Sequence, residues 1–275
     1  MPPYDPSAEV GVQADERGDA LPFLDLGRNV RILSMHGSST SGQMCAVLDG
    51  GRVKCWGHDL AWHLPSGERP DWGDKAEEMG DSLPFLDLGT GFVATEVAVG
   101  STHTCALSEA GEVRCWGVNV LEEAETGELL RSGMCGRGDL APWIPWHIPE
   151  FMGDNLPAVD LGVGKAVAIR AGSAHTCALL DDGNVKCWGH NDRGQLGQGD
   201  TLDRGTSPDE MGDALAAVDL GDDRKVTALS CADNHCCAVR DQQDVVCWGQ
   251  STGVDPVGDE PREMGEFLVP YFELP

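Results

Sequence analysis

Basic residues are scarce in this chain. Its 275 residues include 46 Asp and Glu but only 19 Lys and Arg, which gives a formal charge of −27 at pH 7. No run of five or more basic residues occurs. Because binding to phosphate backbones needs clustered Lys and Arg, we expect no nucleic acid and no anionic membrane among the direct partners. The simplest role of such an acidic surface is solubility.

Long apolar runs are also missing. No stretch approaches the ~20 apolar residues of a membrane-spanning helix, so we expect no direct membrane insertion. Residues 1–19 lack the basic head and the apolar core of a signal peptide. No Asn-x-Ser/Thr sequon is present, so glycosylation gives no independent support for secretion. These absences agree with a mature fragment or with a piece of a longer polypeptide.

Catalytic signatures are absent as well. The chain has no Gly-x-Ser-x-Gly elbow and no His-Glu-x-x-His motif, and no carboxylate pair stands out from the periodic acidic residues. The GQLGQG segment at 194–199 has the wrong spacing for a phosphate loop. The acidic loop from Asp192 to Asp203 lacks the ligand spacing of a calcium hand, which leaves weak surface calcium as an open alternative. We therefore expect no enzyme activity, no cofactor and no metal.

One sequence template is present four times. Each copy ends in Cys-Trp-Gly and carries two cysteines ten positions apart, and the Trp-Gly marks recur after 60, 72 and 60 residues. Such a period indicates a repeat architecture. The copies are MCAVLDGGRVKCWG at 44–57, HTCALSEAGEVRCWG at 103–117, HTCALLDDGNVKCWG at 175–189 and HCCAVRDQQDVVCWG at 235–249.

A Leu-rich motif alternates with this template. Near copies of one ten-residue segment, GDSLPFLDLG at 80–89, also occupy 18–27, 153–162 and 212–221. We expect a single repeat domain over 11–275 after an N-terminal tail, 1–10. The expected units are 18–79, 80–152, 153–211 and 212–262, followed by a closing half-unit, 263–275.

The template predicts a β-hairpin. An Asp-Gly pair between apolar runs, as in the turn 181–183, is a strong hairpin signal. With Gly183 in the left-handed position of a three-residue loop, Cys177 falls opposite Cys187, at the ~4.5 Å Cα separation of a close antiparallel pair. The expected hairpin disulfides are Cys45–Cys55, Cys105–Cys115, Cys177–Cys187 and Cys237–Cys247.

Reduced core cysteines and zinc binding are the alternatives to these disulfides. Both cysteines are present in every unit, as a bond between them requires, and a ten-residue offset does not match the Cys-x₂₋₄-Cys spacing of zinc ligands. A fifth bridge between Cys231 and Cys236 is a further expectation. Cys135 lies in a Gly-rich loop that we expect to be flexible, either as a loop thiol or as a bridge to another chain.

The residues that flank each hairpin are apolar on both faces. This pattern predicts sheets that stack against neighbouring sheets, as the blades of a propeller do. Residues 175–200 resemble the repeat of the regulator of chromosome condensation family, with His-Thr, an apolar pair, a turn with Gly, Trp-Gly and then Gly-Gln-Leu-Gly. We find that last segment only in the third unit, at 194–197.

The resemblance covers about residues 11–275 and implies an all-β fold of antiparallel, four-stranded blades, typically seven. Four and a half units fall short of seven, so we expect a β-propeller or an open propeller arc of four to five units. The cysteine pairs resemble those of Cys-bearing repeats on bacterial or algal surface proteins. They favour an extracellular, cell-surface or other oxidising location.

Histidines recur just before the first hairpin cysteine, as His103, His175 and His235. Because they keep step with the repeat, we expect each of them to make a structural hydrogen bond inside its own blade.

Two loops interrupt the repeat. The first contains Trp62 and Trp72, and the second contains Trp143, Trp146 and His147. Trp is enriched at binding hot spots, although these rings could instead pack over the ends of blades. Prolines stiffen the second loop and would preorganise it.

We therefore expect a non-catalytic binding or assembly module that presents these loops to a protein partner, as part of a larger assembly or alone. One alternative, implied by the resemblance, is guanine-nucleotide exchange or another regulatory role of the nuclear type, which would require reduced cysteines. The other alternative is a propeller enzyme with a site in a central channel, which would need convergent carboxylates there.

Overall fold

The computed structural model describes residues 23–38, 41–57, 73, 75–122, 129–138, 143–144, 148–221, 224–241, 244–250, 257–260, 263–264 and 272–273. Within this part of the chain the regular structure consists of β-strands and short 3₁₀ turns. No helix among these residues is long and apolar enough to cross a bilayer.

Four antiparallel sheets form the blades. Blade 1 contains β1 (Ile32–Gly37), β2 (Gln43–Leu48) and β3 (Arg52–Gly57). Blade 2 contains β4 (Ala94–Val99), β5 (His103–Ser108), β6 (Val113–Val118) and the short β9 (Trp143–Ile144). Blade 3 contains β10 (Ala166–Ala171), β11 (His175–Leu180) and β12 (Val185–Gly189). Blade 4 contains β13 (Val226–Ala232), β14 (Asn234–Arg240), β15 (Asp244–Gln250) and the short β16 (Phe272–Glu273).

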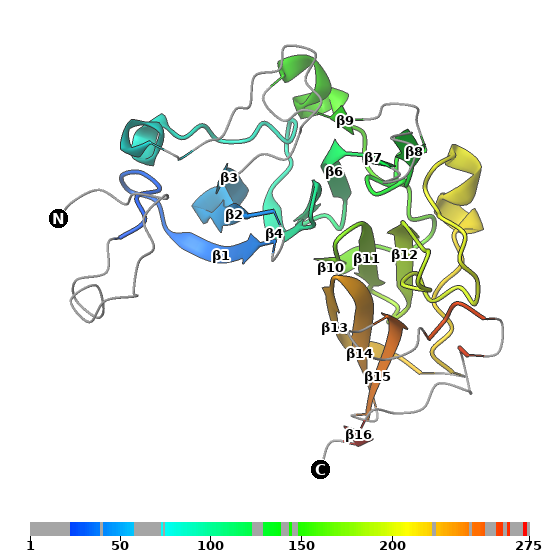
Figure 1. Ribbon diagram of the computed structural model, residues 1–275. Helices are drawn as coiled ribbons and strands as arrows, with labels where there is room; N and C mark the ends of the chain where they lie inside the picture. Colours follow the sequence, from blue (N-terminus) through cyan, green and yellow to red (C-terminus); the bar gives the residue numbers. More distant parts are fainter. Residues whose placement is uncertain are drawn as a thin grey trace, which may run out of the picture.

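The blades follow one another around an arc. Figure 1 shows β1, β4, β10 and β13 on its inner side, with the blue blade 1 at one end and the orange blade 4 at the other. The expected all-β fold, a propeller arc of antiparallel blades, is confirmed. The blades differ from the implied four-stranded form, because a fourth strand is present only as two-residue segments in blades 2 and 4 among the described residues.

The hairpin register follows from the turns. Cys177 lies opposite Cys187, and the Leu180 amide donates to the Asn184 carbonyl at 2.8 Å across a turn in which Gly183 has a φ of 84°. The other three blades align their template cysteines in the same way. The three-residue loop therefore sets which residues face each other across each hairpin.

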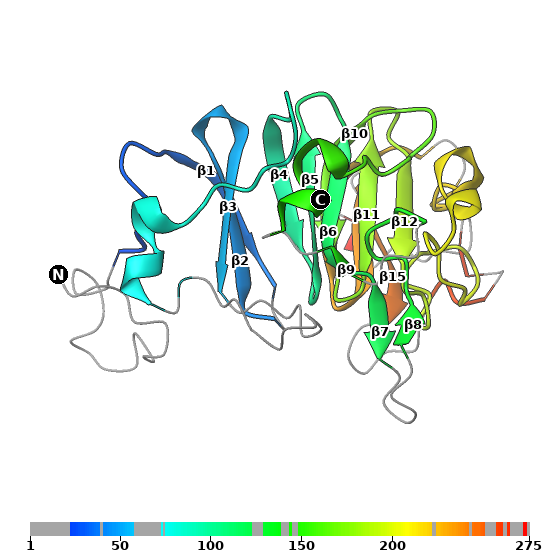
Figure 2. The ribbon, with the colours of Figure 1, turned by 90° about the horizontal axis from the view of Figure 1, so that it is seen from above.

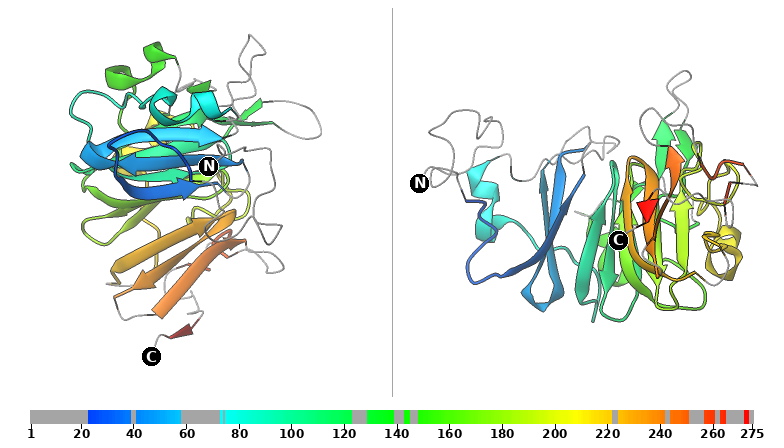
Figure 3. Two further views of the ribbon diagram at one scale, coloured as in Figure 1. Left: turned by 90° about the vertical axis from the view of Figure 1, so that its left-hand side faces the viewer. Right: turned by 90° about the horizontal axis from the view of Figure 1, so that it is seen from below.

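The register also defines two rims. The third strand of each blade ends opposite the start of the second, in the pairs Gln43–Gly57, His103–Gly117, His175–Gly189 and Asn234–Gln250. The chain leaves the blade there, so the loops that interrupt the repeat begin at this rim, which we call the insertion rim. The hairpin β7 (Val120–Glu122) and β8 (Leu129–Arg131) projects from it (Figures 2 and 3). The hairpin turns, such as 181–183, lie at the opposite rim.

The core lies between the blades. All six residues of β5 and all six of β11 are buried, as expected for sheets covered on both faces. One buried apolar cluster runs through blades 1 to 3, and a second joins blades 3 and 4. The tryptophans of the last three Cys-Trp-Gly motifs are fully buried: Trp116, Trp188 and Trp248.

Basic side chains tie successive units together at their Leu-rich segments. Lys54 Nζ donates to the carbonyls of Leu26 and Gly80, at 2.9 and 2.8 Å. Lys186 Nζ donates in the same way to Leu161 and Gly212, both at 2.9 Å. Arg114 makes the corresponding pair of bonds in unit 2, and unit 4 has Val246 at this position. Each donor thus joins its own Leu-rich segment to that of the next unit.

Most of the 3₁₀ turns among the described residues lie at the start of a Leu-rich segment or just before it. The turns are η3 (Asp49–Gly51), η4 (Ala76–Glu78), η5 (Gly80–Ser82), η6 (Pro149–Phe151), η7 (Gly153–Asn155), η8 (Pro208–Glu210) and η9 (Gly212–Ala214), of which only η3 is a hairpin turn.

Candidate functional site at the insertion rim

Five cysteine pairs lie at disulfide distance. Their S–S separations are 2.04–2.13 Å and their Cα separations 4.0–4.1 Å. Four are the hairpin pairs, and the fifth joins Cys231 in β13 to Cys236 in β14. Most of these sulfurs are buried in the blade cores, so an oxidised pair adds a covalent link where the sheet is already packed.

Cys135 is buried, with an exposed fraction of 0%. Cys135 is a loop thiol, which was one of the two predicted alternatives, but its burial argues against the bridge to another chain and against the predicted flexible loop. Gly133, Gly136 and Gly138 all have φ between 61° and 65°, and these left-handed residues fold the loop tightly. The thiol consequently points into the core.

The loop around Cys135 is the second unit's copy of GQLGQG. Gly194, Gly197 and Gly199 have φ values of 62–71°, and Leu196 is buried in the place that Cys135 takes. The Asn119 side chain accepts from the Cys135 amide at 3.0 Å, as Asn191 does from Leu196 at 2.9 Å. The segment is thus shared by units 2 and 3, which corrects its assignment to the third unit alone. The Gly-x-x-Gly-x-Gly spacing, which residues 133–138 share with residues 194–199, could have identified this second copy from the sequence.

These loops hold the next blade's tryptophan. Trp188 Nε1 donates to the Met134 carbonyl and Trp248 Nε1 to the Gln195 carbonyl, both at 3.1 Å. In blades 3 and 4 the tryptophan of the Trp-Gly marker therefore anchors the blade to the loop of the preceding unit, whereas Trp116 Nε1 has no partner among the described residues.

The repeated histidines bond across blades. His103 Nε2 of blade 2 lies 2.7 Å from Thr176 Oγ1 of blade 3. In the first interface Gln43 takes the histidine position, and Thr104 Oγ1 donates to its Oε1 at 3.2 Å. The predicted bond inside each blade is wrong, because the imidazole leaves its own sheet at the strand start and meets the strand stacked on it.

Glycine makes room for each of these rings. A Cβ on Gly172 would lie 2.1 Å from His175 Cε1, and one on Gly100 would lie 2.4 Å from His103 Cε1. The Gly-x-x-His spacing therefore reflects a ring packed flat against backbone.

The buried rings are neutral at ordinary pH. Burial lowers the pKa of His103 to about 4. Burial, aided by neighbouring histidines, lowers the pKa of His175 to about 3. The Nδ1 atoms of both rings have no hydrogen-bond partner among the described residues.

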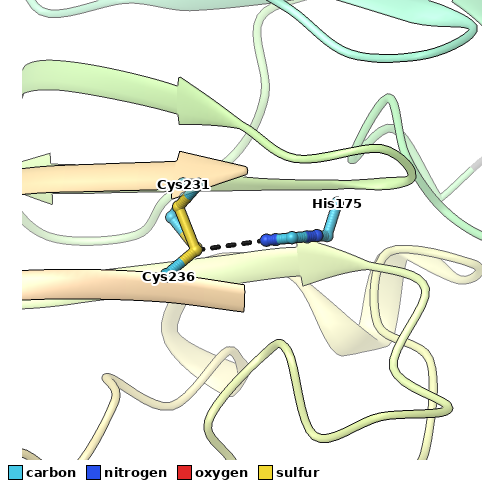
Figure 4. Close-up of side chains that lie close together, drawn as sticks. His175, Cys231 and Cys236 are labelled. Atoms are coloured by element: carbon cyan, nitrogen blue, oxygen red, sulfur yellow. Dashed lines mark hydrogen bonds between the residues drawn. A yellow bond between two sulfur atoms is a disulfide. The ribbon is translucent and has the colours of Figure 1, made fainter. Parts of the chain in front are cut away.

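At the third interface a sulfur replaces the hydroxyl. Cys236 stands where Thr176 stands in blade 3, and His175 Nε2 lies 3.1 Å from its Sγ (Figure 4). Cys177 Sγ is 3.5 Å from the same sulfur. His175, Cys177, Cys231 and Cys236 thus form one cluster, in which the potential ligand atoms lie within 4.8 Å of one another.

A cavity of about 190 Å³ opens beside this cluster. It lies where the inner strands turn into the second strands, and equivalent residues of all four blades line it: Gly37, Val99, Ala171 and Cys231. Of these four side chains only Cys231 is reactive. The cavity is on the insertion rim, because the second strands start there.

The predicted contact residues fall in the insertions. Trp62, Trp72, Trp146 and His147 lie outside the described residues. The backbone of Trp143 is in β9, where it pairs with Val118 of β6. The second insertion is therefore attached to the outer edge of blade 2.

The acidic loop of unit 3 uses its carboxylates internally. Asp203 contacts His190 Nδ1 at 3.1 Å and accepts from the Asn191 amide at 2.8 Å. Asp200 pairs with Arg204 at 2.7 Å. Burial lowers the pKa of His190, but the hydrogen bond and charge of Asp203 outweigh it and hold that pKa above its ordinary value.

Comparison with protein families decides the relationship. A model described as the regulator of chromosome condensation (RCC1) repeat matches residues 94–120 and 166–195, and a second model of that description matches 182–239. Residues 94–120 and 166–239 of the chain therefore match RCC1 repeats. The matched segments contain the hairpins of blades 2 and 3 and the GQLGQG loop.

Curated proteins match most of the chain at 26–29% identity. The ultraviolet-B receptor UVR8 of Arabidopsis thaliana is 29% identical over 75% of this chain, and the mitochondrial RCC1 domain-containing protein RUG3 of the same plant is 28% identical over 78%. The chain spans 39% and 41% of their lengths. The human E3 ubiquitin-protein ligase HERC2 is 26% identical over 79% of this chain, which amounts to 4% of the ligase.

Solved structures, yeast RCC1 among them, share the fold. Yeast RCC1 (Prp20), in its complex with Kap60, superposes with a TM-score of 0.55 at 19% identity, covering 82% of this chain and 43% of that one. Human WBSCR16 gives 0.55 at 18% identity, covering 88% of this chain and 53% of that one.

Proposed function

We propose that this RCC1-repeat protein is a non-catalytic, disulfide-stapled binding module whose insertion rim engages a protein partner. The observation that supports this most directly is the contrast between the rims. At the opposite rim the hairpins turn in a few residues, as at 49–51 and 181–183. At the insertion rim the units differ in length and content, and variable loops on a rigid frame are where binding residues concentrate.

The proposed contact residues are Trp62, Trp72, Trp143, Trp146 and His147. The net charge of −27 supports a partner with basic groups at its surface and disfavours nucleic acid. Binding of Kap60 by yeast RCC1 supports a protein-binding role for propellers of this fold.

An oxidising location, extracellular or at the cell surface, is part of the proposal. It is supported by the five cysteine pairs at disulfide distance. Alkylation of the isolated protein followed by intact-mass measurement tests it, and we expect ten blocked cysteines. Eleven alkylated cysteines would contradict it and favour the nuclear-type regulator.

Crosslinking tests the surface itself. A photoreactive amino acid would replace Trp72 or Trp143, which belong to the two insertions, and Asp182 on the opposite rim as the control. In the cells that produce the protein, we expect one polypeptide to crosslink from the first two positions and not from the third. High salt should weaken this product. Equal products from both rims would contradict the proposal.

A further inference from the structure

We propose that Cys231 and Cys236 form a redox-active disulfide that exchanges with thiols entering the cavity on the insertion rim. In this exchange His175 donates a hydrogen bond to Cys236 Sγ, the sulfur that leaves as a thiolate. This activity would be separate from partner binding by the insertion loops.

The pair is an addition to the repeat. Gly37, Val99 and Ala171 occupy the Cys231 position in the other blades, and Met44, Thr104 and Thr176 occupy the Cys236 position. These blades pack without a disulfide at this place, so scaffold stability alone does not require one in blade 4.

The two sulfurs differ in access. Cys231 is half-buried and lines the cavity, whereas Cys236 is fully buried. An incoming thiolate therefore reaches Cys231 Sγ, and Cys236 Sγ becomes the leaving group. The cavity volume of about 190 Å³ admits a small thiol or the cysteine side chain of a partner.

His175 is placed to assist that departure. A disulfide sulfur carries no proton, so the 3.1 Å contact with Cys236 Sγ is a hydrogen bond only if Nε2 donates. The neutral ring, set by its depressed pKa of about 3, has one N–H to give. This donation stabilises a thiolate at Cys236 and offsets part of its burial cost, and a better-stabilised leaving thiolate departs faster.

The exchange balances in two steps. A thiolate attacks Cys231 Sγ, a new S–S bond forms between them, and the Cys231–Cys236 bond breaks to release the Cys236 thiolate. A second external thiolate then attacks the external sulfur of the mixed disulfide and releases Cys231 as a thiolate. Two external thiols are oxidised to one disulfide, their two protons pass to Cys231 and Cys236, and the protein disulfide is reduced by two electrons.

Reduction kinetics test this in the intact protein. Limiting dithiothreitol or reduced glutathione would be added, and free thiols would be alkylated at intervals and mapped by mass spectrometry. The internal control is Cys237–Cys247, because both its cysteines are also half-buried but lie on the other face of β14. We expect Cys231–Cys236 to open about tenfold faster than this control. Equal or slower opening would overturn the proposal.

A matched pair of variants tests the histidine. His175→Gln should slow opening of Cys231–Cys236 by about tenfold, whereas His103→Gln, which perturbs the equivalent bond to Thr176, should leave it unchanged. Equal effects of the two variants would overturn the role of His175. A protein isolated with these cysteines reduced and one zinc ion bound by the four-residue cluster would overturn the redox proposal itself.

Discussion

The interface between blades 2 and 3 and the interface between blades 3 and 4 use the same histidine position with different partners. His103 meets the hydroxyl of Thr176, and His175 meets the sulfur of Cys236. The ring, its burial and the glycine behind it are the same in both. A repeat can therefore change the chemistry of one interface by a single substitution while the frame around it stays constant.

The largest effect is expected where the two interfaces agree. Below pH 6.5 the unfolded chain protonates both histidines, whereas their native pKa values are about 4 and 3, so the free energy of unfolding falls as the pH drops towards 4. The loss should be on the order of 3 kcal/mol per histidine. Denaturant unfolding at pH 7 and at pH 4 measures this loss of unfolding free energy. In the His103→Gln variant the difference between the two pH values should shrink by the contribution of one histidine. An unchanged pH dependence in that variant would contradict the assignment.

Removal of the Thr176 hydroxyl should weaken the interface between blades 2 and 3. Thr176→Val leaves the buried His103 Nε2 without its partner and should cost about 1–3 kcal/mol in unfolding free energy. The control is Thr227→Val, because Thr227 is exposed and should change stability by less than about 0.5 kcal/mol. Similar losses of unfolding free energy in both variants would contradict a stabilising role of the bond between His103 and Thr176.

The interface between blades 3 and 4 can be given the histidine–hydroxyl bond of the interface between blades 2 and 3. The double variant Cys231→Ala/Cys236→Thr loses the small disulfide loop, worth about 2 kcal/mol, and regains a histidine–hydroxyl bond worth about 1 kcal/mol. Cys231→Ala/Cys236→Ala loses both. Urea unfolding should therefore rank the Thr variant above the Ala variant by about 1 kcal/mol. Equal stabilities would mean that His175 does not need an acceptor.

The smallest effect concerns His190, whose pKa is raised whereas the pKa values of His103 and His175 are lowered. His190 has a raised pKa, so its contribution is fully present below pH 6.5 and is lost as the pH rises through the native value. We expect about 0.5 kcal/mol for this half-exposed group. Asp203→Asn should lower the pKa of His190 in an NMR titration while the pKa of His103 stays unchanged. A constant pKa of His190 would exclude Asp203 as the cause.

The sequence predicted the features that depend on residues close together in the chain, such as the hairpin register, but not the contacts between blades. An Asp-Gly turn fixes the hairpin register, so the opposition of Cys177 and Cys187 follows from counting. The partner of His103 depends on how one blade stacks on the next, and no spacing in the chain encodes that distance. Cys135 was missed because its side chain differs from Leu196, although the glycines around both match.

The basic ties between Leu-rich segments were also missed. A Lys or Arg precedes the second template cysteine in three of the four units, and this recurrence could have identified the ties from the sequence. A lone basic residue in a hairpin is ordinarily read as solvent-facing, whereas Lys54 is 1% exposed. Two carbonyls make that burial acceptable, and they come from two chain segments, one 28 residues before Lys54 and one 26 residues after it.

These ties make the molecule a one-dimensional array. Because Lys54, Arg114 and Lys186 each couple only adjacent units, removal of one of them should weaken one junction of the arc rather than soften the whole arc evenly. Among the described residues, unit 4 has no basic side chain that joins its Leu-rich segment to a following one. Arg240 donates a hydrogen bond to one carbonyl of that segment, that of Leu220. Opening would then start at blade 4, the blade that carries the extra cysteine pair.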